Sequence, residues 1–352
     1  MIKYSTEPTY RLLEVMGWGY LDNWRPISLG EKMKVGDMEI TAHNAGHVLG
    51  SVQFEVATPE GTILYTGDFD MGNSYTMESA RPMSCDILVI ESTFGAPMFK
   101  FPKRSEVSLD MVRWALMEAL PAGKVPTFRT DSIGNAQEVI SVFNRMTKLP
   151  VVTAKSATKV SDIYRQYGFD LEYVDASSPE GRDLLEGGRC ALVTPKGSKL
   201  IGDNLEPALA SGWAVMMRNR GTAFPLSDHA DFRALLSFIR RCHPKRVLTF
   251  HGGKLTKGFA DYVRRRLGID AKPLTSREET LMGPVTRGEI RMKACYEQML
   301  RSVRIPGFEY TSPWLMKEMA RRGFTRGETE AALRHLLERK VFIETSSGVK
   351  LA

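Results

Sequence analysis

The sequence predicts a layered α/β protein with a second α/β unit inserted into the first and a small C-terminal module. Three observations support this fold class. Strand-like runs and turns dominate the first 96 residues, helical and strand-like segments alternate from about 97 to 212, and two buried-strand patterns each end in an ionisable side chain. A chain of 352 residues, 43% hydrophobic and 25% charged, has the length and composition of an ordinary globular protein with two or three domains.

The first unit is expected at residues 1–96. Two hairpins are predicted there, at 32–42 and 52–66, because each pair of strand-like runs flanks a glycine-containing turn. The run 86–91 is apolar up to its last residue, Glu91, which is typical of a strand covered on both faces.

The inserted unit is expected at residues 97–212. Its predicted helices are 105–120, 135–145 and 157–167, and its predicted strands are 124–128, 150–154 and 191–194. The first unit then resumes at 213–275. We expect a strand at 213–217, a helix that ends at Arg241 with Ser227 or Asp228 as its N-cap, and a buried strand that ends in His251.

A third unit is expected at residues 276–352. Two helical stretches, 313–322 and 326–339, precede a short hairpin at 341–351, and this order is that of a winged helix. In such modules the second helix enters the DNA major groove. The second helix here mixes Arg and Glu, so a module that contacts protein is the alternative.

The net charge of +7 and the pI near 9.1 favour a polyanionic partner, which means DNA or RNA. No apolar run approaches the roughly 20 residues of a membrane span, so no membrane association is expected. The four cysteines are scattered without metal-site spacing, which argues against a cysteine zinc site and fits a reducing cytoplasm.

Five ionisable residues follow predicted strands or begin a predicted helix: His47, Asp68, Glu91, His229 and His251. Carboxyl ends of strands line one edge of an α/β sheet, so we expect these side chains to converge. An imidazole and a carboxylate on one hairpin, His47 and Asp68, suit a metal ion such as Zn²⁺. Taken singly, each could instead be a loop residue whose hydrogen bonds are satisfied by the backbone.

The surrounding motifs resemble those of a known family. Ala45-Gly-His-Val-Leu-Gly-Ser51 and Thr66-Gly-Asp-Phe69 resemble the third and fourth metal motifs of metallo-β-lactamase-fold hydrolases. The segments that resemble motifs of the β-CASP branch, the nucleic-acid-processing nucleases, are Glu91–Gly95, Ser227–Asp231, Phe250–Gly252 and Gly134–Glu138. The last has Asn135 where a basic residue is usual. The resemblance covers about residues 3–275 and is nearest to the DNA-ligase-associated exonuclease-like and mRNA 3′-end processing group.

The resemblance implies a fold and a site. The fold would be a truncated metallo-β-lactamase αββα sandwich at 1–96 and 213–275, with a β-CASP domain at 97–212. His47 would bind one zinc ion, His251 another, and Asp68 would bridge them, so that the ions clamp a phosphodiester displacement. His229 would donate to the scissile phosphate or leaving oxygen. Glu91 would orient His229, and a carboxylate beside an imidazole also raises the imidazole pKa.

One departure from the family pattern concerns the metal ligands. The family motif His-x-His-x-Asp-His supplies most ligands, and none of the six histidines here forms it. We therefore expect the N-terminal part of the family fold to be missing, zinc binding to be weak, and a sheet edge or an apolar face to be uncovered. The missing segment could lie upstream or on a second chain. The first hypothesis is a metal-dependent nuclease, incomplete as this chain stands; the alternatives are a non-catalytic nucleic-acid-binding subunit and a metallo-hydrolase of small esters.

Overall fold

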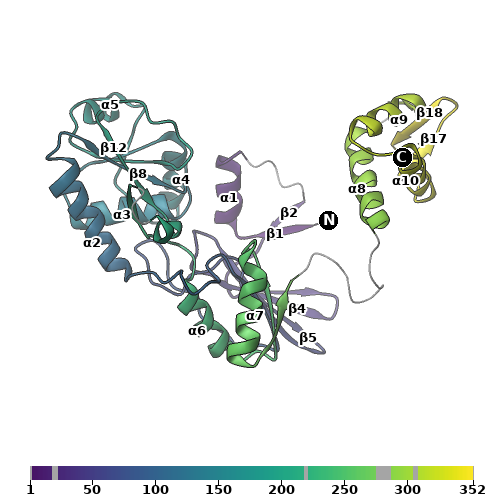
Figure 1. Ribbon diagram of the computed structural model, residues 1–352, viewed down its shortest axis with the longest axis horizontal. Helices are drawn as coiled ribbons and strands as arrows, with labels where there is room; N and C mark the ends of the chain where they lie inside the picture. Colours follow the sequence, from purple (N-terminus) through teal and green to yellow (C-terminus); the bar gives the residue numbers. More distant parts are fainter. Residues whose placement is uncertain (1, 18–22, 218–220, 275–286, 304–307, 352) are drawn as a thin grey trace. The chain divides into compact units, whose positions relative to one another are not determined.

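The computed structural model describes residues 2–17, 23–217, 221–274, 287–303 and 308–351. It divides into two compact units, residues 1–274 and 275–352. The described part of the larger unit contains a seven-stranded sheet, a six-stranded sheet and a two-stranded parallel pair (Figure 1). All five candidate site residues belong to this unit.

The first sheet has seven strands in the order β15-β14-β7-β6-β5-β4-β3. Its hairpins join β3 to β4 and β5 to β6, and β6, β7, β14 and β15 run parallel. The strands are β3 (Lys32–Val35), β4 (Met38–Asn44), β5 (Val52–Thr58), β6 (Gly61–Tyr65), β7 (Ile87–Glu91), β14 (Arg246–Phe250) and β15 (Asp270–Pro273). Both predicted hairpins and the buried strand β7 are confirmed. Strand β14 is present as predicted but is buried on one face only, since Val247 and Thr249 are buried whereas Leu248 and Phe250 are partly exposed.

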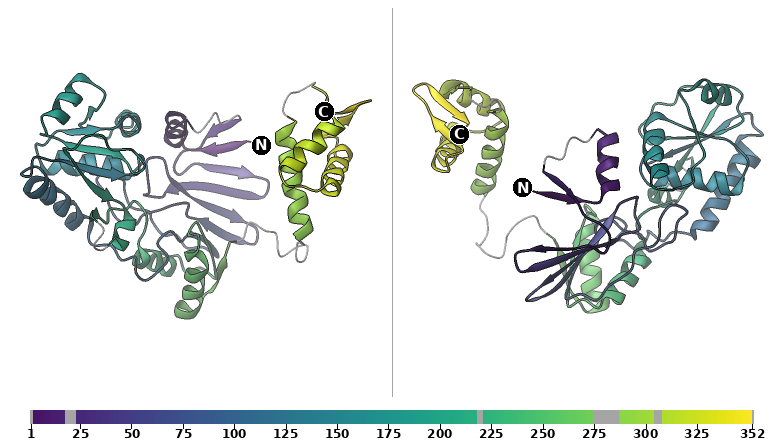
Figure 2. Two further views of the ribbon diagram at one scale, coloured as in Figure 1. Left: turned by 45° about the horizontal axis from the view of Figure 1, so that its top comes forward. Right: turned by 180° about the vertical axis from the view of Figure 1, so that it is seen from behind.

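Helices α6 (Phe232–Cys242) and α7 (Leu255–Leu267) pack on one face of this sheet (Figure 2). Leu64, Leu88 and Val247 point to that side and are fully buried. Because side chains alternate along a strand, Ile63, Phe54, Leu248 and Phe250 point to the other face, where all four are partly exposed. Tyr65 on this face is 37% exposed and stacks on Phe250. An incompletely covered apolar face is therefore present, as expected.

Two local predictions near the site are wrong. Helix α6 begins at Phe232 with Asp231 as its N-cap, since the Asp231 carboxylate accepts the Ala234 N–H. The Ser227 hydroxyl instead accepts the His229 N–H and holds the preceding loop in a turn. Residues predicted as a strand at 213–217 form a short 3₁₀ helix, η2 (Gly212–Met216), because the chain turns sharply after β12.

The second sheet has six parallel strands in the order β10-β9-β11-β8-β12-β13, with α2 to α5 beside them. Phe128, Phe143 and Tyr164 are fully buried in its core. The strands are β8 (Val125–Thr130), β9 (Val151–Thr153), β10 (Val174–Asp175), β11 (Ala191–Pro195), β12 (Leu205–Ala210) and β13 (Thr222–Phe224). The helices are α2 (Arg104–Trp114) with a π-helical extension η1 (Ala115–Ala119), α3 (Asn135–Met146), α4 (Lys155–Gln166) and α5 (Pro179–Glu186). Helix α5 and strands β10, β12 and β13 were not predicted.

A short N-terminal segment completes the larger unit. Strands β1 (Lys3–Ser5) and β2 (Trp24–Pro26) form a parallel pair, and α1 (Glu7–Val15) begins at the N-cap Thr6. Leu12 of α1 is buried in the core of the six-stranded unit.

Within its described residues, 287–303 and 308–351, the smaller unit contains three helices and a three-stranded antiparallel sheet. Its elements are α8 (Arg287–Ser302), β16 (Tyr310–Thr311), α9 (Ser312–Arg321), α10 (Arg326–Glu338), β17 (Phe342–Glu344) and β18 (Gly348–Leu351). The predicted order of two helices and a hairpin is confirmed, and a capping box between Thr325 and Glu328 starts α10. Among all described residues, no helix is both long and apolar enough to cross a membrane.

Candidate metal centre

The five predicted residues come together at the carboxyl edge of the seven-stranded sheet. His47 lies in the loop between β4 and β5, Asp68 follows β6, Glu91 ends β7 and His251 follows β14. These strands are adjacent, so their ends meet at one edge. His229 reaches the same place from the loop before α6. His251 has a backbone φ of +50°, in the left-handed region that non-glycine residues adopt uncommonly.

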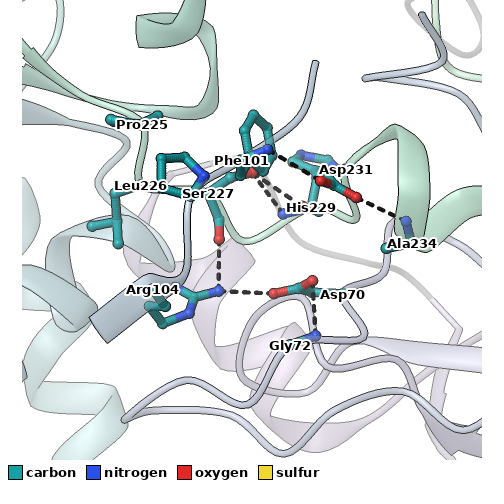
Figure 3. Close-up of a pocket in the computed structure, with 11 residues that line it drawn as sticks. Asp70, Gly72, Phe101, Arg104, Pro225, Leu226, Ser227, His229, Asp231 and Ala234 are labelled. Atoms are coloured by element: carbon teal, nitrogen blue, oxygen red, sulfur yellow. Dashed lines mark hydrogen bonds and ion pairs between the residues drawn. The ribbon is translucent and has the colours of Figure 1, made fainter. Parts of the chain in front are cut away.

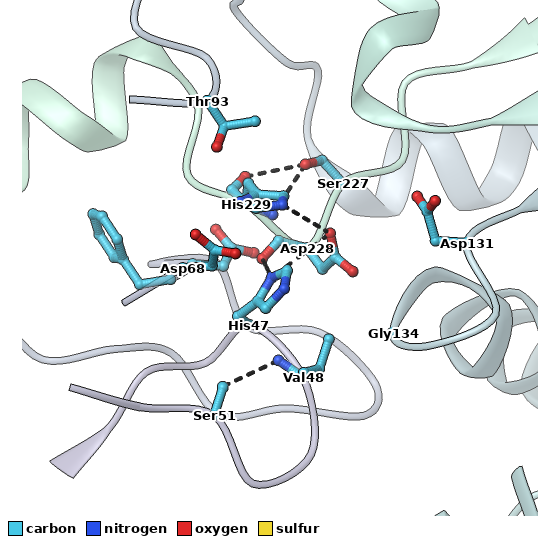
Figure 4. A network of polar contacts seen from close by, with 12 residues as sticks. His47, Val48, Ser51, Asp68, Thr93, Asp131, Gly134, Ser227, Asp228 and His229 are labelled. Atoms are coloured by element: carbon cyan, nitrogen blue, oxygen red, sulfur yellow. Dashed lines mark hydrogen bonds and ion pairs between the residues drawn. The ribbon is translucent and has the colours of Figure 1, made fainter. Parts of the chain in front are cut away.

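Three of the side chains form a compact group (Figure 4). His47, Asp68 and His229 each offer a ligand atom, and these atoms lie within 4.8 Å of one another. His251 adjoins this group, because its Nδ1 lies 2.5 Å from Asp68 Oδ1. All four line a cleft of about 730 Å³, whereas Glu91 is completely buried behind His229.

The His47 ring is oriented by a backbone contact. Its Nδ1 donates to the Asp228 carbonyl oxygen at 2.9 Å, which leaves the Nε2 lone pair available. Histidines that bind metal ions usually donate their other ring nitrogen to a carbonyl or carboxylate in this way. The contact therefore presents His47 as a nitrogen ligand.

His229 is held by Glu91. The His229 Nδ1 lies 3.0 and 3.1 Å from the two Glu91 carboxylate oxygens, and Glu91 also accepts the Phe69 N–H and the Thr93 hydroxyl. Burial disfavours the charged form of both groups, but their pairing outweighs it. The pKa of His229 is raised to about 10, and the pKa of Glu91 is lowered. Asp228 and Asp68 add to the His229 shift.

These pKa shifts predict a pH dependence of stability for the zinc-free protein. The pKa of Glu91 is lower in the folded protein than its ordinary value of 4.5. Its contribution to the free energy of unfolding is therefore present above pH 4.5 and is lost on acidification. The pKa of His229 is raised in the folded protein. Its contribution to the free energy of unfolding is therefore complete below pH 6.5 and is lost as the pH rises toward 10. Chemical denaturation from pH 6.5 to 10 should show a decline in unfolding free energy that is smaller in Glu91→Gln. Equal declines in both proteins would contradict the pairing.

Asp228 lies at the centre, although its position in the sequence indicated only a helix cap within the Ser227–Asp231 motif. Its carboxylate is 3.8 Å from His47 Nδ1 and 4.0 Å from His229 Nε2, and it is 14% exposed. Gly134 makes room for it: a Cβ at Gly134 would lie 2.2 Å from Asp228 Oδ2, and the φ of +82° also favours glycine. The adjacency of Asp228 to His229 in one motif was the available signal.

A buried ion network supports the His229 loop from behind (Figure 3). Arg104 donates to Asp70 at 2.8 Å and to the Ser227 carbonyl oxygen at 2.7 Å, and it lies 3.5 Å from Glu138. Glu138 also accepts the Tyr75 N–H, which ties the six-stranded unit to the loop after β6. Burial raises the pKa of Asp70, and Arg104 opposes that shift. No motif or local pattern in the sequence indicated that Arg104 or Asp70 supports the site.

The donor set fits a zinc ion. The imidazoles of His47 and His251 and the carboxylate of Asp68 are ligand types of zinc sites that keep an open coordination position. Shared between two ions, these three residues would give each ion only two protein ligands, Asp68 with His47 and Asp68 with His251. The predicted assignment of His47 to one ion and His251 to the other, with Asp68 between them, stays a prediction.

Several known proteins are similar to this chain in sequence or in fold. Residues 215–273 match the family described as the Zn-dependent metallo-hydrolase RNA specificity domain. The chain is 31% identical over 253 residues to a probable DNA ligase of Opitutus terrae, an alignment that covers 67% of this chain and 23% of the relative. It is 29% identical over 302 residues to RNase aCSPSF2 of Saccharolobus solfataricus, an alignment that covers 71% of this chain and 60% of the relative. A crystal structure of a protein of unknown function from Enterococcus faecalis has a similar fold, with a TM-score of 0.50, 14% identity and coverage of 72% and 71%.

The chain thus spans less than two thirds of the length of these two curated relatives. The match to the zinc-dependent domain covers His229 and His251, two of the residues that converge on the cleft. Its relatives include a ribonuclease, and its motifs occur in the expected order. The matched zinc-dependent domain, these relatives and the order of the motifs together support a relationship of the chain to the β-CASP family of metallo-β-lactamase-fold nucleases.

Proposed function

We propose that this protein is a metal-dependent nuclease that hydrolyses phosphodiester bonds in DNA or RNA. One observation carries the proposal: a fully buried carboxylate, Glu91, pairs with His229 at the wall of a cleft that His47, Asp68 and His251 also line. A charged pair at the edge of an open cleft is costly to bury and typical of a reactive site.

His47, Asp68 and His251 would hold the zinc. When bound, zinc supplies Lewis-acid stabilisation of the charge that develops on a phosphoryl group. Within the chain, the carbonyl of Asp228 fixes the His47 ring, and Asp68 reaches both His47 and His251. Of the three proposed zinc ligands, Asp68 is therefore the one on which zinc binding depends most.

His229 would act as the general acid. Glu91 holds the Nδ1 side of the ring and keeps the imidazole protonated, which leaves Nε2 available to the cleft. From there a proton can pass to the scissile phosphate or to the leaving oxygen. Glu91 acts through His229 and is a positioning residue.

The proposal also assigns the parts of the chain. The six-stranded unit, expected at 97–212, would be the inserted β-CASP domain, since it contributes Asp131, Ile133 and Lys196 to the cleft. Residues 276–352 would be a winged helix, a reading supported by the order α9, α10, β17, β18. Single strands of DNA or RNA would lie in the cleft.

A second candidate is a nucleic-acid-binding subunit without catalysis. The limited ligand set for a second metal ion favours it, because in-line phosphodiester hydrolysis commonly uses two.

A cleavage assay separates the two candidates. The protein is stripped of metal with a chelator, and labelled single-stranded DNA and RNA are incubated with it before and after zinc is restored. A nuclease cleaves only with zinc, and Asp68→Ala does not cleave. If the protein binds the single-stranded DNA and RNA but cleaves neither at any zinc concentration, the result would contradict the nuclease proposal and favour a non-catalytic binding subunit.

A further inference from the structure

Trp213 presents a large exposed aromatic surface at the candidate centre. It is the second residue of η2 and lines the same cleft as His229, Thr93 and His251. Its side chain is 46% exposed, although indole rings are usually well buried. Nothing in the proposed chemistry uses this ring.

The ring is rigidly supported from the protein side. Trp213 packs against Phe94 and Phe99, with ring centroids 5.1 and 5.3 Å away, and Phe94 in turn lies 5.9 Å from the His229 ring. Gly212 permits this packing, because a Cβ there would lie 2.5 Å from Phe94. An aromatic ring fixed on one side and open on the other is ready to stack on a ligand.

A cation lines the same cleft. Lys196 is 33% exposed and forms an ion pair with Asp131 at 2.5 Å, and both lie along the cleft with the apolar Ile133. Asp68, Asp131 and Asp228 also line the cleft, so the aromatic ring, rather than the charge of the lining, points to a nucleic-acid strand. Aromatic side chains on which bases stack are typical of proteins that bind single strands. Stacking needs a free base face, and in a duplex both faces are covered by neighbouring bases.

We propose that Trp213 stacks on one unpaired base of a single-stranded nucleic acid whose phosphate lies against His47, Asp68 and His229. The inference rests on the proposed function and deepens it, because it names a residue that positions the substrate and the part of the strand, an unpaired base, that this residue contacts. Trp213 is a binding residue and contributes no proton or metal ligand.

The test is a double-mutant cycle between the protein and the nucleic acid. Anisotropy of a labelled single-stranded oligonucleotide gives the affinity of the zinc-loaded wild type, Trp213→Ala and Trp213→Phe. The measurement is repeated with a set of oligonucleotides that each lack one base at a different position. A DNA arm and an RNA arm distinguish the two sources of the base. Trp314→Ala, a change of another partly exposed tryptophan in the smaller unit, is the matched control.

Stacking predicts that Trp213→Ala weakens binding by about 5- to 150-fold. Removing one particular base from the oligonucleotide should weaken wild-type binding to a similar extent. The same removal should leave the affinity of Trp213→Ala unchanged. Trp213→Phe should retain much of the affinity, and Trp314→Ala should preserve the dependence on that base.

Additive losses at every base position, or unchanged affinity in Trp213→Ala, would overturn the inference while leaving the nuclease proposal intact. A wild type that binds neither oligonucleotide would overturn both. Equal affinity of the wild type for duplex and single strand would overturn the single-strand specificity.

Discussion

His229→Ala should abolish most cleavage of single-stranded nucleic acid by the zinc-loaded protein. General acid catalysis typically contributes 10²- to 10⁴-fold, so we expect a loss of roughly that size. The reason lies in the geometry: the Glu91 carboxylate fixes the His229 ring at 3.0 Å, and no alanine side chain can deliver a proton to the cleft. Single-turnover rates with excess enzyme measure the loss directly.

The bound metal decides which role His229 has. If His229 is the acid, the variant keeps its zinc on His47, Asp68 and His251, and metal analysis gives the wild-type value. Because a His229 nitrogen also lies within 4.8 Å of His47 and Asp68 ligand atoms, loss of zinc would instead make it a ligand. His243→Ala, which changes an exposed histidine at the end of α6, should leave both rate and zinc unchanged.

Arg104→Ala should destabilise the protein by about 3–5 kcal/mol, because removing one member of a buried ion network leaves uncompensated charges. Arg104 contacts Asp70, whose side chain is 10% exposed, and Glu138, which is 3% exposed. It also holds the Ser227 carbonyl, so the loop that carries His229 loses a support. Urea denaturation at constant pH measures the free energy of unfolding.

The matched control is Arg113→Ala in the same helix. Arg113 is exposed near the end of α2, and its loss should change stability by only a few tenths of a kcal/mol. A loss below about 1 kcal/mol in Arg104→Ala would contradict the network. A second variant, Arg104→Met, keeps the volume and isolates the effect of the missing charge.

The sequence predicted the sheet edge well because strand ends are local features. Alternating or continuous apolar patterns located β5, β6, β7 and β14, and the rule that parallel strand ends share an edge brought Asp68, Glu91 and His251 together. The Glu91–His229 contact was expected from the resemblance to the family motifs, and the two side chains do lie 3.0 Å apart. These features depend on periodicity and spacing, which a single sequence carries.

The features that were not predicted depend on packing between distant segments. Arg104 reaches Asp70 and Ser227 across 34 and 123 residues of sequence, and no local pattern encodes such contacts. The residues at 213–217 have a strand-like composition, but Gly212 must approach Phe94 closely, and the chain turns into η2. The cap of α6 moved to Asp231 because Ser227 is engaged within the His229 loop.

Isothermal titration calorimetry with zinc tests the metal centre most directly. The proposed centre brings four side chains together: His47, Asp68, His229 and His251. The wild type should bind zinc, with the modest affinity of a site that has few protein ligands, and Asp68→Ala should lose that binding. Asp131→Ala removes an exposed carboxylate from the same cleft and should retain it. Zinc binding that survives in Asp68→Ala, or that falls equally in both variants, would contradict the metal centre.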